Sequence, residues 1–319
     1  MEKGGLSVSG HRFPIVILPG IERIPLAALC RPDVILSPAA PSVGFIRRDA
    51  GDLRIYFIAN TGNSPLKLEA NFRVEGTPPE WWDPHTGEVT PAPVIGRSRN
   101  GVAVSLELEP YGSRLLVFGD RPSRMTPAPA RELPPPLDLA GGWDVIFEET
   151  GKHVRMDRLR SWSEYPDTRF YSGRAAYKRS FSCPAAFLTK DIRATLDLGE
   201  AAPVAPQPKA RFQAWVDAPV RKAAVVCVNG KRAGAAWHPP YEVDVTGLLR
   251  AGENELKIIV GNLAVNQLAG EPLPDYKDLD ARYGHKFDPQ DLTNLQPVPS
   301  GLLGAVRLFA RPSVRMIAP

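Results

Sequence analysis

Hydrophobic and polar residues alternate along several short stretches of this chain. In LKLEANFRV, residues 66–74, every second side chain is apolar and the side chains between are polar. This period of two is typical of a strand with one face buried. Residues 102–108 repeat the alternation, and turn sequences such as NTGNSP, DPHTGE and GRSRNG separate the apolar stretches. Residues 43–119 are therefore predicted to form a small antiparallel β-sandwich.

A second series of short apolar stretches follows residue 137. The predicted strands are residues 143–147, 175–181, 192–198, 223–228, 255–260 and 305–309. No stretch with a helical period separates them, which favours a sandwich or jelly roll over an α/β fold. Asn229 and Gly230 have the composition of a two-residue type I′ hairpin turn. The predicted fold class is all-β, with two antiparallel β-sandwich or jelly-roll domains at residues 43–119 and 137–319.

The segments outside these two domains lack a periodic apolar pattern. Residues 120–136, DRPSRMTPAPARELPPP, contain six prolines and are predicted to be an extended, fairly stiff linker. Residues 1–42 fit neither sandwich. Within them, FPIVILPG (13–20) reads as a strand without a partner, and an isolated strand is not stable. We expect this segment to be a remnant, or a strand lent to a neighbour.

Length and composition agree with two β-rich domains. A chain of 319 residues is long enough for about two domains with separate cores. Its 34 prolines argue against long helices. The net charge of +4 comes from scattered basic residues, so nucleic acid is not an expected partner. No stretch is apolar enough to suggest a membrane span, and the N-terminus lacks the features of a signal peptide.

The sequence lacks the common catalytic and metal-binding signatures. It contains no HExxH, GxSxG, Walker loop or GxGxxG motif, and its five histidines have no metal-ligand spacing. Cys30, Cys183 and Cys227 are predicted to be small buried hydrophobic residues, because they are odd in number and far apart. No metal and no cofactor are expected, and catalytic residues are not assigned.

Aromatic residues give a clearer indication of a ligand. Trp and Tyr rings can stack on the apolar face of a sugar, while amides, carboxylates and guanidinium groups bind its hydroxyls. Such residues gather in the predicted loops of the second domain, including the long polar segment 271–292. The candidate carbohydrate-binding residues are Trp162, Trp237, His238, Tyr241, Asn262, Asn266, Asp275, Tyr276, Arg282 and Tyr283. The competing interpretation is structural, with Trp143, Tyr177 and Trp237 filling the core; Trp162 or Trp237 is expected to be exposed.

Several longer stretches resemble a known family. Residues 52–89, DLRIYFIANTGNSPLKLEANFRVEGTPPEWWDPHTGEV, resemble the β-sandwich that follows the catalytic barrel in α-L-rhamnosidases of glycoside hydrolase family 106. LAGGWDVIF, SWSEYPDTRFYSGRAAYKRSF, WHPPY, GNL and SGLLGAVRLF resemble the sugar-binding jelly roll of the same enzymes, which is related to that of family 2 glycosidases. The family's catalytic carboxylates lie in a barrel without a counterpart in this sequence, and none is carried over. The resemblance implies a periplasmic or extracellular location.

Three functional hypotheses follow. The leading one is a carbohydrate-binding accessory or truncated protein of the α-L-rhamnosidase type, non-catalytic by itself, whose ligand is a rhamnose-containing or plant cell-wall oligosaccharide. The second is a compact glycoside hydrolase with carboxylates in the second domain, drawn from Asp275, Asp278, Asp280 and Glu164. The third is a structural partner of a separately encoded catalytic barrel. A homo-oligomer is left open.

Overall fold

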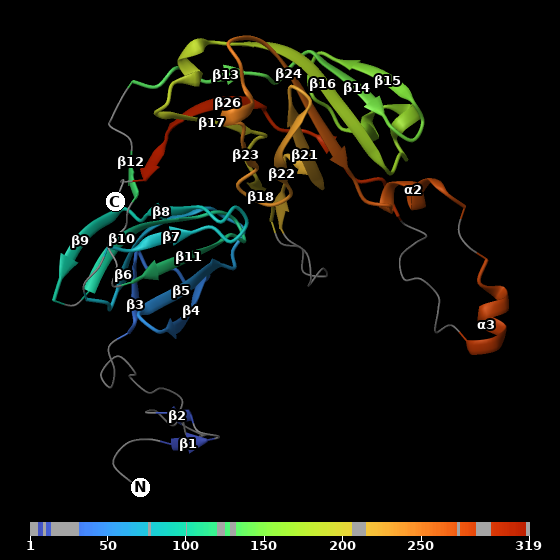
Figure 1. Ribbon diagram of the computed structural model, residues 1–319. Coiled ribbons are helices and arrows are strands. Elements are labelled where there is room, and N and C mark those ends of the chain that lie inside the picture. Colours follow the sequence, from blue (N-terminus) through green and yellow to red (C-terminus); the bar gives the residue numbers. More distant parts are fainter. Residues whose placement is uncertain are drawn as a thin grey trace.

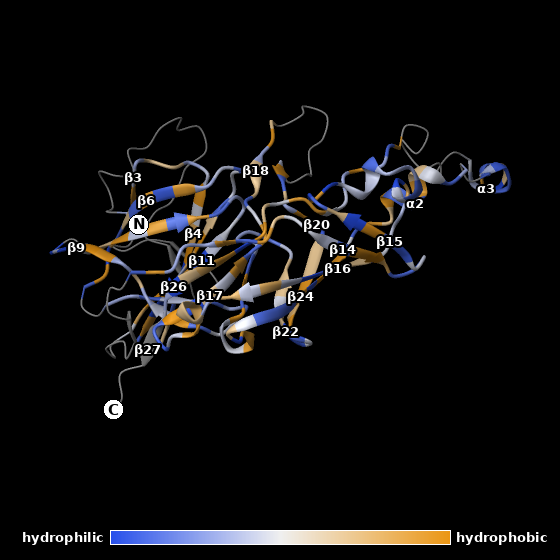
Figure 2. Ribbon diagram, turned by 90° about the horizontal axis from the view of Figure 1, so that it is seen from above, coloured by the Kyte–Doolittle hydropathy of each residue, from blue (hydrophilic) through white to orange (hydrophobic). Residues whose placement is uncertain are grey.

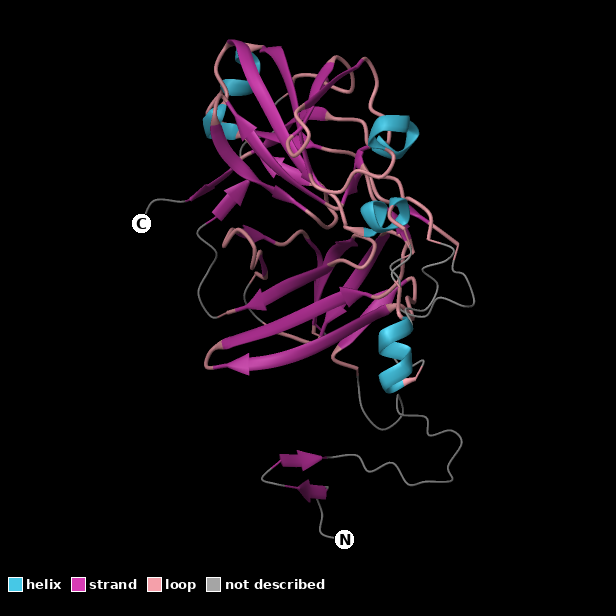
Figure 3. Ribbon diagram, turned by 90° about the vertical axis from the view of Figure 1, so that its right-hand side faces the viewer, coloured by secondary structure: helices cyan, strands magenta, loops and turns pink. Residues whose placement is uncertain are grey.

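The computed structural model consists mainly of antiparallel strands arranged in two β-sandwiches (Figure 1). It describes residues 6–8, 11–13, 32–75, 78–99, 101–119, 125–127, 132–205, 215–272, 275–284 and 295–316. Seen from the side, one sandwich lies above the other, and helices are few and short (Figure 3). The predicted all-β class with two sandwiches is confirmed.

The first sandwich has two facing sheets. One has the strand order β3-β6-β10-β9 and the other β4-β5-β11-β7-β8. Their bounds are β3 Val34–Ser37, β4 Val43–Ala50, β5 Leu53–Asn60, β6 Leu66–Phe72, β7 Glu80–Trp82, β8 Val89–Pro91, β9 Val94–Ser98, β10 Gly101–Leu108 and β11 Ser113–Phe118.

The predicted alternation places apolar side chains between these sheets. In β6, Leu68, Ala70 and Phe72 are buried. The ring of Phe72 contacts that of Tyr56 edge-on at 5.0 Å and lies 5.7 Å from the ring of Phe118. These three aromatic rings form the centre of a small core, because such tilted and edge-on contacts are favourable for aromatic pairs.

The first sandwich begins earlier than the sequence indicated. β3 pairs with β6, with Val34 opposite Phe72 and Ser37 opposite Glu69. Part of the expected N-terminal segment 1–42 therefore belongs to the first sandwich, because β6 needs a hydrogen-bonding partner on its outer edge. Further upstream, β1 (Leu6–Val8) pairs with β2 (His11–Phe13). Residues 14–20 of the strand predicted at 13–20 lie outside the described residues.

The second sandwich is larger and also has two main sheets. One has the order β15-β14-β16-β24-β21-β22 and the other β13-β26-β17-β23. Their bounds are β13 Leu137–Asp138, β14 Trp143–Phe147, β15 Lys152–Met156, β16 Arg174–Cys183, β17 Ile192–Asp197, β21 Ala223–Val228, β22 Lys231–Ala236, β23 Glu242–Asp244, β24 Gly252–Gly261 and β26 Arg307–Pro312.

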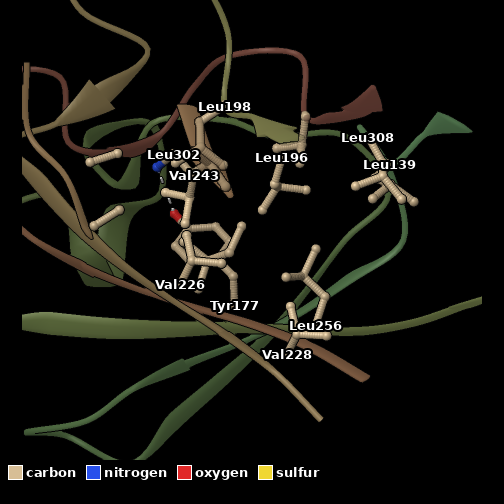
Figure 4. Close-up of a cluster of buried hydrophobic side chains, with 14 of the residues drawn as sticks. Leu139, Tyr177, Leu196, Leu198, Val226, Val228, Val243, Leu256, Leu302 and Leu308 are labelled. Carbon is tan, nitrogen blue, oxygen red and sulfur yellow. Dashed lines mark hydrogen bonds between the residues drawn. The ribbon is translucent and has the colours of Figure 1, made fainter. Parts of the chain in front are cut away.

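The core of the second sandwich is fully closed to solvent. Figure 4 shows Leu196, Leu198 and Leu308 on one side facing Tyr177, Val226 and Leu256 on the other. The hydroxyl of Tyr177 accepts a hydrogen bond of 3.1 Å from the backbone N–H of Leu302 (Figure 4). Burial raises the pKa of Tyr177 to about 12, so this phenol stays neutral inside the core.

Minor elements connect and flank the two sandwiches. Besides the β1–β2 pair, three two-stranded sheets are present in the described residues. They pair β12 (Met125–Pro127) with β27 (Val314–Met316), β18 (Ala202–Pro203) with β19 (Val216–Asp217), and β20 (Val220–Arg221) with β25 (Gly301–Leu302). The short helices are η1 Trp162–Glu164, η2 Pro166–Thr168, η3 Ala185–Leu188, η4 Thr246–Leu248, α2 Val265–Gly270 and α3 Lys277–Tyr283. β12 lies within the expected linker, so part of that segment pairs with the end of the chain.

The predicted hairpin turn at Asn229–Gly230 is confirmed. Both residues have positive φ, 50° and 78°, as a type I′ turn requires. The Asn229 side-chain amide donates to the carbonyl of Leu248 at 2.9 Å and to the side-chain oxygen of Asn254 at 2.8 Å. Asn229 also accepts a hydrogen bond from the N–H of Glu255. The turn is thus tied to the β24 region, and these residues have a structural role.

Polar contacts hold the two sandwiches together. The Asn63 side chain donates to the carbonyl groups of Val204 and Trp215 at 2.9 and 3.0 Å. Arg193 in β17 contacts both carboxylate oxygens of Glu88 at 2.7 and 2.8 Å. Because Asn63 and Glu88 lie on the first sandwich and their partners on the second, these contacts define the junction between the two sandwiches.

Candidate functional site

An exposed aromatic cluster lies at the junction between the sandwiches. It consists of His85, from the β7–β8 turn, together with Trp237 and His238, from the segment between β22 and β23. The ring centroids of His85 and His238 are 4.8 Å apart, and Trp237 contacts His238 edge-on at 4.4 Å. Trp237 is 58% exposed. Contributions from both sandwiches therefore hold an accessible indole ring in a defined orientation.

The turn DPHTGE positions His85. The Asp83 carboxylate accepts a 2.8 Å hydrogen bond from the backbone N–H of His85, and the N–H of Gly87 donates to the Asp83 carbonyl at 2.8 Å. Burial by itself would raise the pKa of Asp83, but hydrogen bonds from the His85 and Thr86 N–H groups hold that pKa below its usual value. The ionised carboxylate thus keeps the turn closed near neutral pH.

The segment WHPPY positions the other two rings. His238 Nδ1 lies 2.7 Å from the carbonyl oxygen of Pro239. Residues 237–240 form a bend. The bend turns Trp237 outward, whereas Tyr241 at its end is 5% exposed and packs in the core of the second sandwich.

Trp162 does not contribute an accessible ring, so the expectation that it can stack on a sugar is wrong. It is 0% exposed, and its ring lies 5.4 Å from that of Phe147 and 5.5 Å from that of Tyr171. Its Nε1–H donates to the Tyr177 hydroxyl at 2.6 Å. Burial follows because η1 turns the ring inward, where its N–H finds a partner.

Two of the candidate asparagines are occupied by internal hydrogen bonds. The Asn262 side chain accepts from the N–H of Gly173 at 2.9 Å and donates to the carbonyl of Tyr171 at 2.9 Å. Asn266 is 0% exposed and bonds both backbone groups of Val298 at 2.9 Å. These amides connect loops of the second sandwich, so the structure provides no free amide group for a ligand at either position.

The remaining candidates lie on or beside α3. Asp275 accepts a 3.0 Å hydrogen bond from the N–H of Lys277, while Arg282 and Tyr283 are exposed at the end of the helix. α3 projects away from β22 in both views and is coloured mostly hydrophilic (Figures 1 and 2). Asp275, Tyr276, Arg282 and Tyr283 therefore do not share a surface with Trp237. Residues 285–292 of the predicted polar loop lie outside the described residues.

Sequence inspection missed the role of His85. His85 and His238 lie in different domains, and only the packing of those domains brings their rings together. The single local signal was the DPHTGE turn, which places a histidine at the tip of a tight loop. Among the described residues, no group of three or more His, Cys, Asp or Glu side chains could hold a metal ion.

Carboxylates with raised pKa values also lie at the junction. Burial raises the pKa of Glu109 in the first sandwich. Attraction to Arg114 lowers this pKa and repulsion from Glu200 raises it, with burial as the largest effect. Burial likewise raises the pKa of Asp197 and of Glu242, which are ladder partners in β17 and β23. Glu109 and Glu242 repel each other across the junction. Protonation of Glu109 or Glu242 therefore removes repulsion between the two sandwiches.

We expect Glu109→Gln to stabilise the protein at pH 8 but not at pH 4. A carboxylate with a raised pKa contributes stability that is present below its unfolded value, about 4.3, and lost as pH rises through its folded pKa. Glutamine cannot ionise, so the variant keeps this stability at high pH. Thermal melting of both proteins across this pH range measures the difference in Tm. A difference that does not grow with pH would show that the pKa of Glu109 is not raised in the folded protein.

Among the described residues, no helix is both long and apolar enough to cross a membrane. Of the cysteines, Cys183 is buried and Cys227 is partly buried, and both are free thiols. Burial raises the pKa of the Cys183 thiol. Cys30 lies outside the described residues.

Comparison with known proteins places this fold among glycoside hydrolases. The glycoside hydrolase family 106 profile, described as α-L-rhamnosidase, matches residues 19–94. A rhamnosidase from Novosphingobium sp. PP1Y has a similar structure, with a TM-score of 0.66 and 27% sequence identity, over 90% of this chain and 26% of the rhamnosidase. A Formosa agariphila protein named "Putative beta-glucuronidase" is 34% identical over 196 residues, which are 59% of this chain and 14% of that protein.

These similarities agree with the fold. The chain is rich in β-strands and similar to parts of glycoside hydrolases. More specifically, the chain resembles the α-L-rhamnosidases of glycoside hydrolase family 106. The stretch 52–89 that carries this resemblance in the sequence lies inside the matched range. The chain spans 26% of the rhamnosidase and 14% of the Formosa agariphila protein.

Proposed function

We propose that this chain binds carbohydrate through the aromatic cluster and is non-catalytic by itself. The observation that carries the proposal is the 58% exposed ring of Trp237, oriented by His85 and His238 at the junction. Indole rings stack on the apolar face of a sugar, and imidazole nitrogens at the same place bind hydroxyl groups. The resemblance to α-L-rhamnosidases supports a rhamnose-containing or plant cell-wall oligosaccharide as the ligand.

The positions of the candidate carboxylates support a non-catalytic role. Glycoside hydrolysis requires two carboxyl groups facing one bond, about 5 to 10 Å apart. Glu164 instead accepts a hydrogen bond from the N–H of Ser161 and caps η1, and Asp275 accepts a hydrogen bond from the N–H of Lys277 beside α3. Among the described residues, Glu164 therefore belongs to a different local structure from Asp275, Asp278 and Asp280, which lie on or beside α3.

Isothermal titration with rhamnose-containing oligosaccharides and pectic fragments tests the proposal. We expect Trp237→Ala to weaken binding roughly 10- to 100-fold, because one central aromatic residue commonly contributes about 2 kcal/mol or more to binding. Trp237→Phe should retain part of the affinity, since it keeps an aromatic face. Melting curves of the variants check that the fold is intact.

Tyr283→Ala is the matched control, because Tyr283 is 56% exposed but lies on α3. Its affinity should equal that of the unchanged protein. An equal loss for both variants would place α3 in the ligand site. Absence of heat with every oligosaccharide would overturn the proposal and favour a structural partner of a separate catalytic barrel. Sugar release from nitrophenyl glycosides by the purified chain would contradict the non-catalytic assignment.

A further inference from the structure

The first sandwich contains an arginine-lined pocket that is separate from the aromatic cluster. Its volume is about 390 Å³, which lies within the range of small-ligand sites. Its main lining residues are Arg47 in β4, Arg54 in β5, Arg73 and Glu75 after β6, Arg99 in the β9–β10 turn, and Gly101. Strands and turns of both sheets contribute, so the pocket lies at one end of the sandwich. We call it the arginine pocket.

Two of the four arginines are held in place by carboxylates. Arg73 Nε lies 3.1 Å from Asp33 Oδ1, and an Arg47 nitrogen lies 3.5 Å from the other Asp33 oxygen. Arg47 also donates to Asp49 at 3.1 Å. This hydrogen bond is the main reason that the pKa of Arg47 is raised, so its charge is retained throughout the accessible pH range. The two guanidinium groups are therefore ordered before any ligand arrives.

The other two arginines, Arg54 and Arg99, make no direct side-chain pair within the described part of the chain. Of the nearby carboxylates, Glu75 lines the pocket, whereas Asp33 and Asp49 are already engaged by Arg47 and Arg73. Asp52 lines a neighbouring hollow of about 350 Å³ that shares Arg47 and Arg54. The guanidinium N–H groups of Arg54 and Arg99 are therefore available to bind a ligand.

A buried tyrosine lies beneath one of these arginines. Tyr56 is 0% exposed, and its hydroxyl has no hydrogen-bond partner within the described part of the chain. The guanidinium of Arg47 lies over the Tyr56 ring, 5.9 Å from its centroid. Burial raises the pKa of Tyr56, and the charges of Arg47, Asp33 and Arg54 are close enough to act on it. Tyr56 does not line the pocket, so its ring supports the Arg47 guanidinium from beneath and makes no contact with a ligand.

We propose that the arginine pocket binds the carboxylate or sulfate group of an acidic saccharide. Guanidinium groups match such oxyanions with paired N–H donors, and Arg54 and Arg99 have these donors free for a ligand. No aromatic ring lines the pocket, which disfavours nucleic acid because single strands bind by base stacking. The saccharide part rests on the proposed carbohydrate function, whereas the oxyanion part rests on the pocket alone.

Titration of three ligands tests this site. They are an oligogalacturonate, a sulfated oligosaccharide of the same length, and a neutral rhamnose-containing oligosaccharide. We expect the double variant Arg54→Gln and Arg99→Gln to weaken binding of at least one acidic ligand by 10-fold or more and to leave the neutral ligand unchanged. A loss of affinity for the oligogalacturonate would indicate carboxylate recognition, and a loss for the sulfated oligosaccharide would indicate sulfate recognition. Trp237→Ala should instead weaken binding of the neutral ligand and leave the contribution of the acidic group unchanged. Failure of this site and failure of the proposed function are therefore distinguishable.

Two further variants make the test specific. Arg232→Gln removes an exposed charge from β22 in the second sandwich and should leave all affinities unchanged. Arg54→Lys with Arg99→Lys keeps the charge but loses the paired donors, so partial loss is expected. Equal weakening by Arg232→Gln would show a general charge effect and overturn the proposal, as would no binding of either acidic ligand. Competition by inorganic sulfate as effective as the acidic oligosaccharides would overturn the saccharide part.

Discussion

Replacing Trp162 with alanine is expected to destabilise the protein by about 3–5 kcal/mol, the usual cost of deleting a buried tryptophan. The indole ring is fully buried between Phe147 and Tyr171, and its N–H donates to the Tyr177 hydroxyl. Alanine would leave a cavity and remove that hydrogen bond. Chemical denaturation followed by circular dichroism measures the change in the free energy of unfolding.

Trp237→Ala is the matched control for this prediction. The same substitution at an exposed position should change the free energy of unfolding by no more than about 0.5 kcal/mol. Trp162→Phe should have an intermediate effect, because it retains most of the volume but not the N–H donor. Similar stability of the two alanine variants would contradict the assignment of Trp162 to the core and reopen its predicted role in sugar binding.

Asn266→Ala is expected to destabilise the second sandwich by about 2–3 kcal/mol, because buried backbone groups would lose their partners. The Asn266 side chain accepts from the N–H of Val298 and donates to its carbonyl, both at 2.9 Å, and donates to the Ser300 hydroxyl. These bonds fasten α2 to the segment that precedes β25. Alanine satisfies none of these groups, and the closed packing around a 0% exposed side chain hinders water from replacing the amide. Chemical denaturation again measures the cost.

Gln267→Ala, at the next position of α2, provides the control. Gln267 is exposed and its side chain bonds Glu271, also exposed, so its loss should cost less than about 0.5 kcal/mol. Affinity for the oligosaccharides should be the same in both variants wherever the fold is intact. A variant at Asn266 that keeps full stability but loses ligand affinity would show that the amide contacts sugar.

Secondary structure could be predicted from the sequence where the physical cause is local. The alternation in residues 66–72 led to β6, since a period of two exposes one face of a strand whatever lies around it. The Asn229–Gly230 turn was predictable because its backbone needs positive φ, which these residues tolerate. The start of β3 was not predictable, because its pairing with β6 depends on a partner far along the chain.

The candidate site was predictable only in part. Trp162 and Trp237 each precede a tyrosine by three or four residues in the sequence, yet one is 0% and the other 58% exposed. Burial is decided by which neighbours close over a ring: η1 turns Trp162 into the core, whereas the bend at 237–240 turns Trp237 out of it. The asparagines were mistaken for ligand groups for the same reason, since their backbone partners are supplied by distant loops.

The sequence by itself determined that this protein is built from short antiparallel strands, that these form two sandwiches, and which family it resembles. These properties follow from local periodicity, turn chemistry and recurring motifs. Only the tertiary structure decided which aromatic rings are accessible, brought His85 to Trp237 and His238, and gathered four arginines around one pocket. Each of those arrangements joins residues from separate strands or separate sandwiches, and such contacts depend on how buried surfaces pack, which spacing along the chain does not encode.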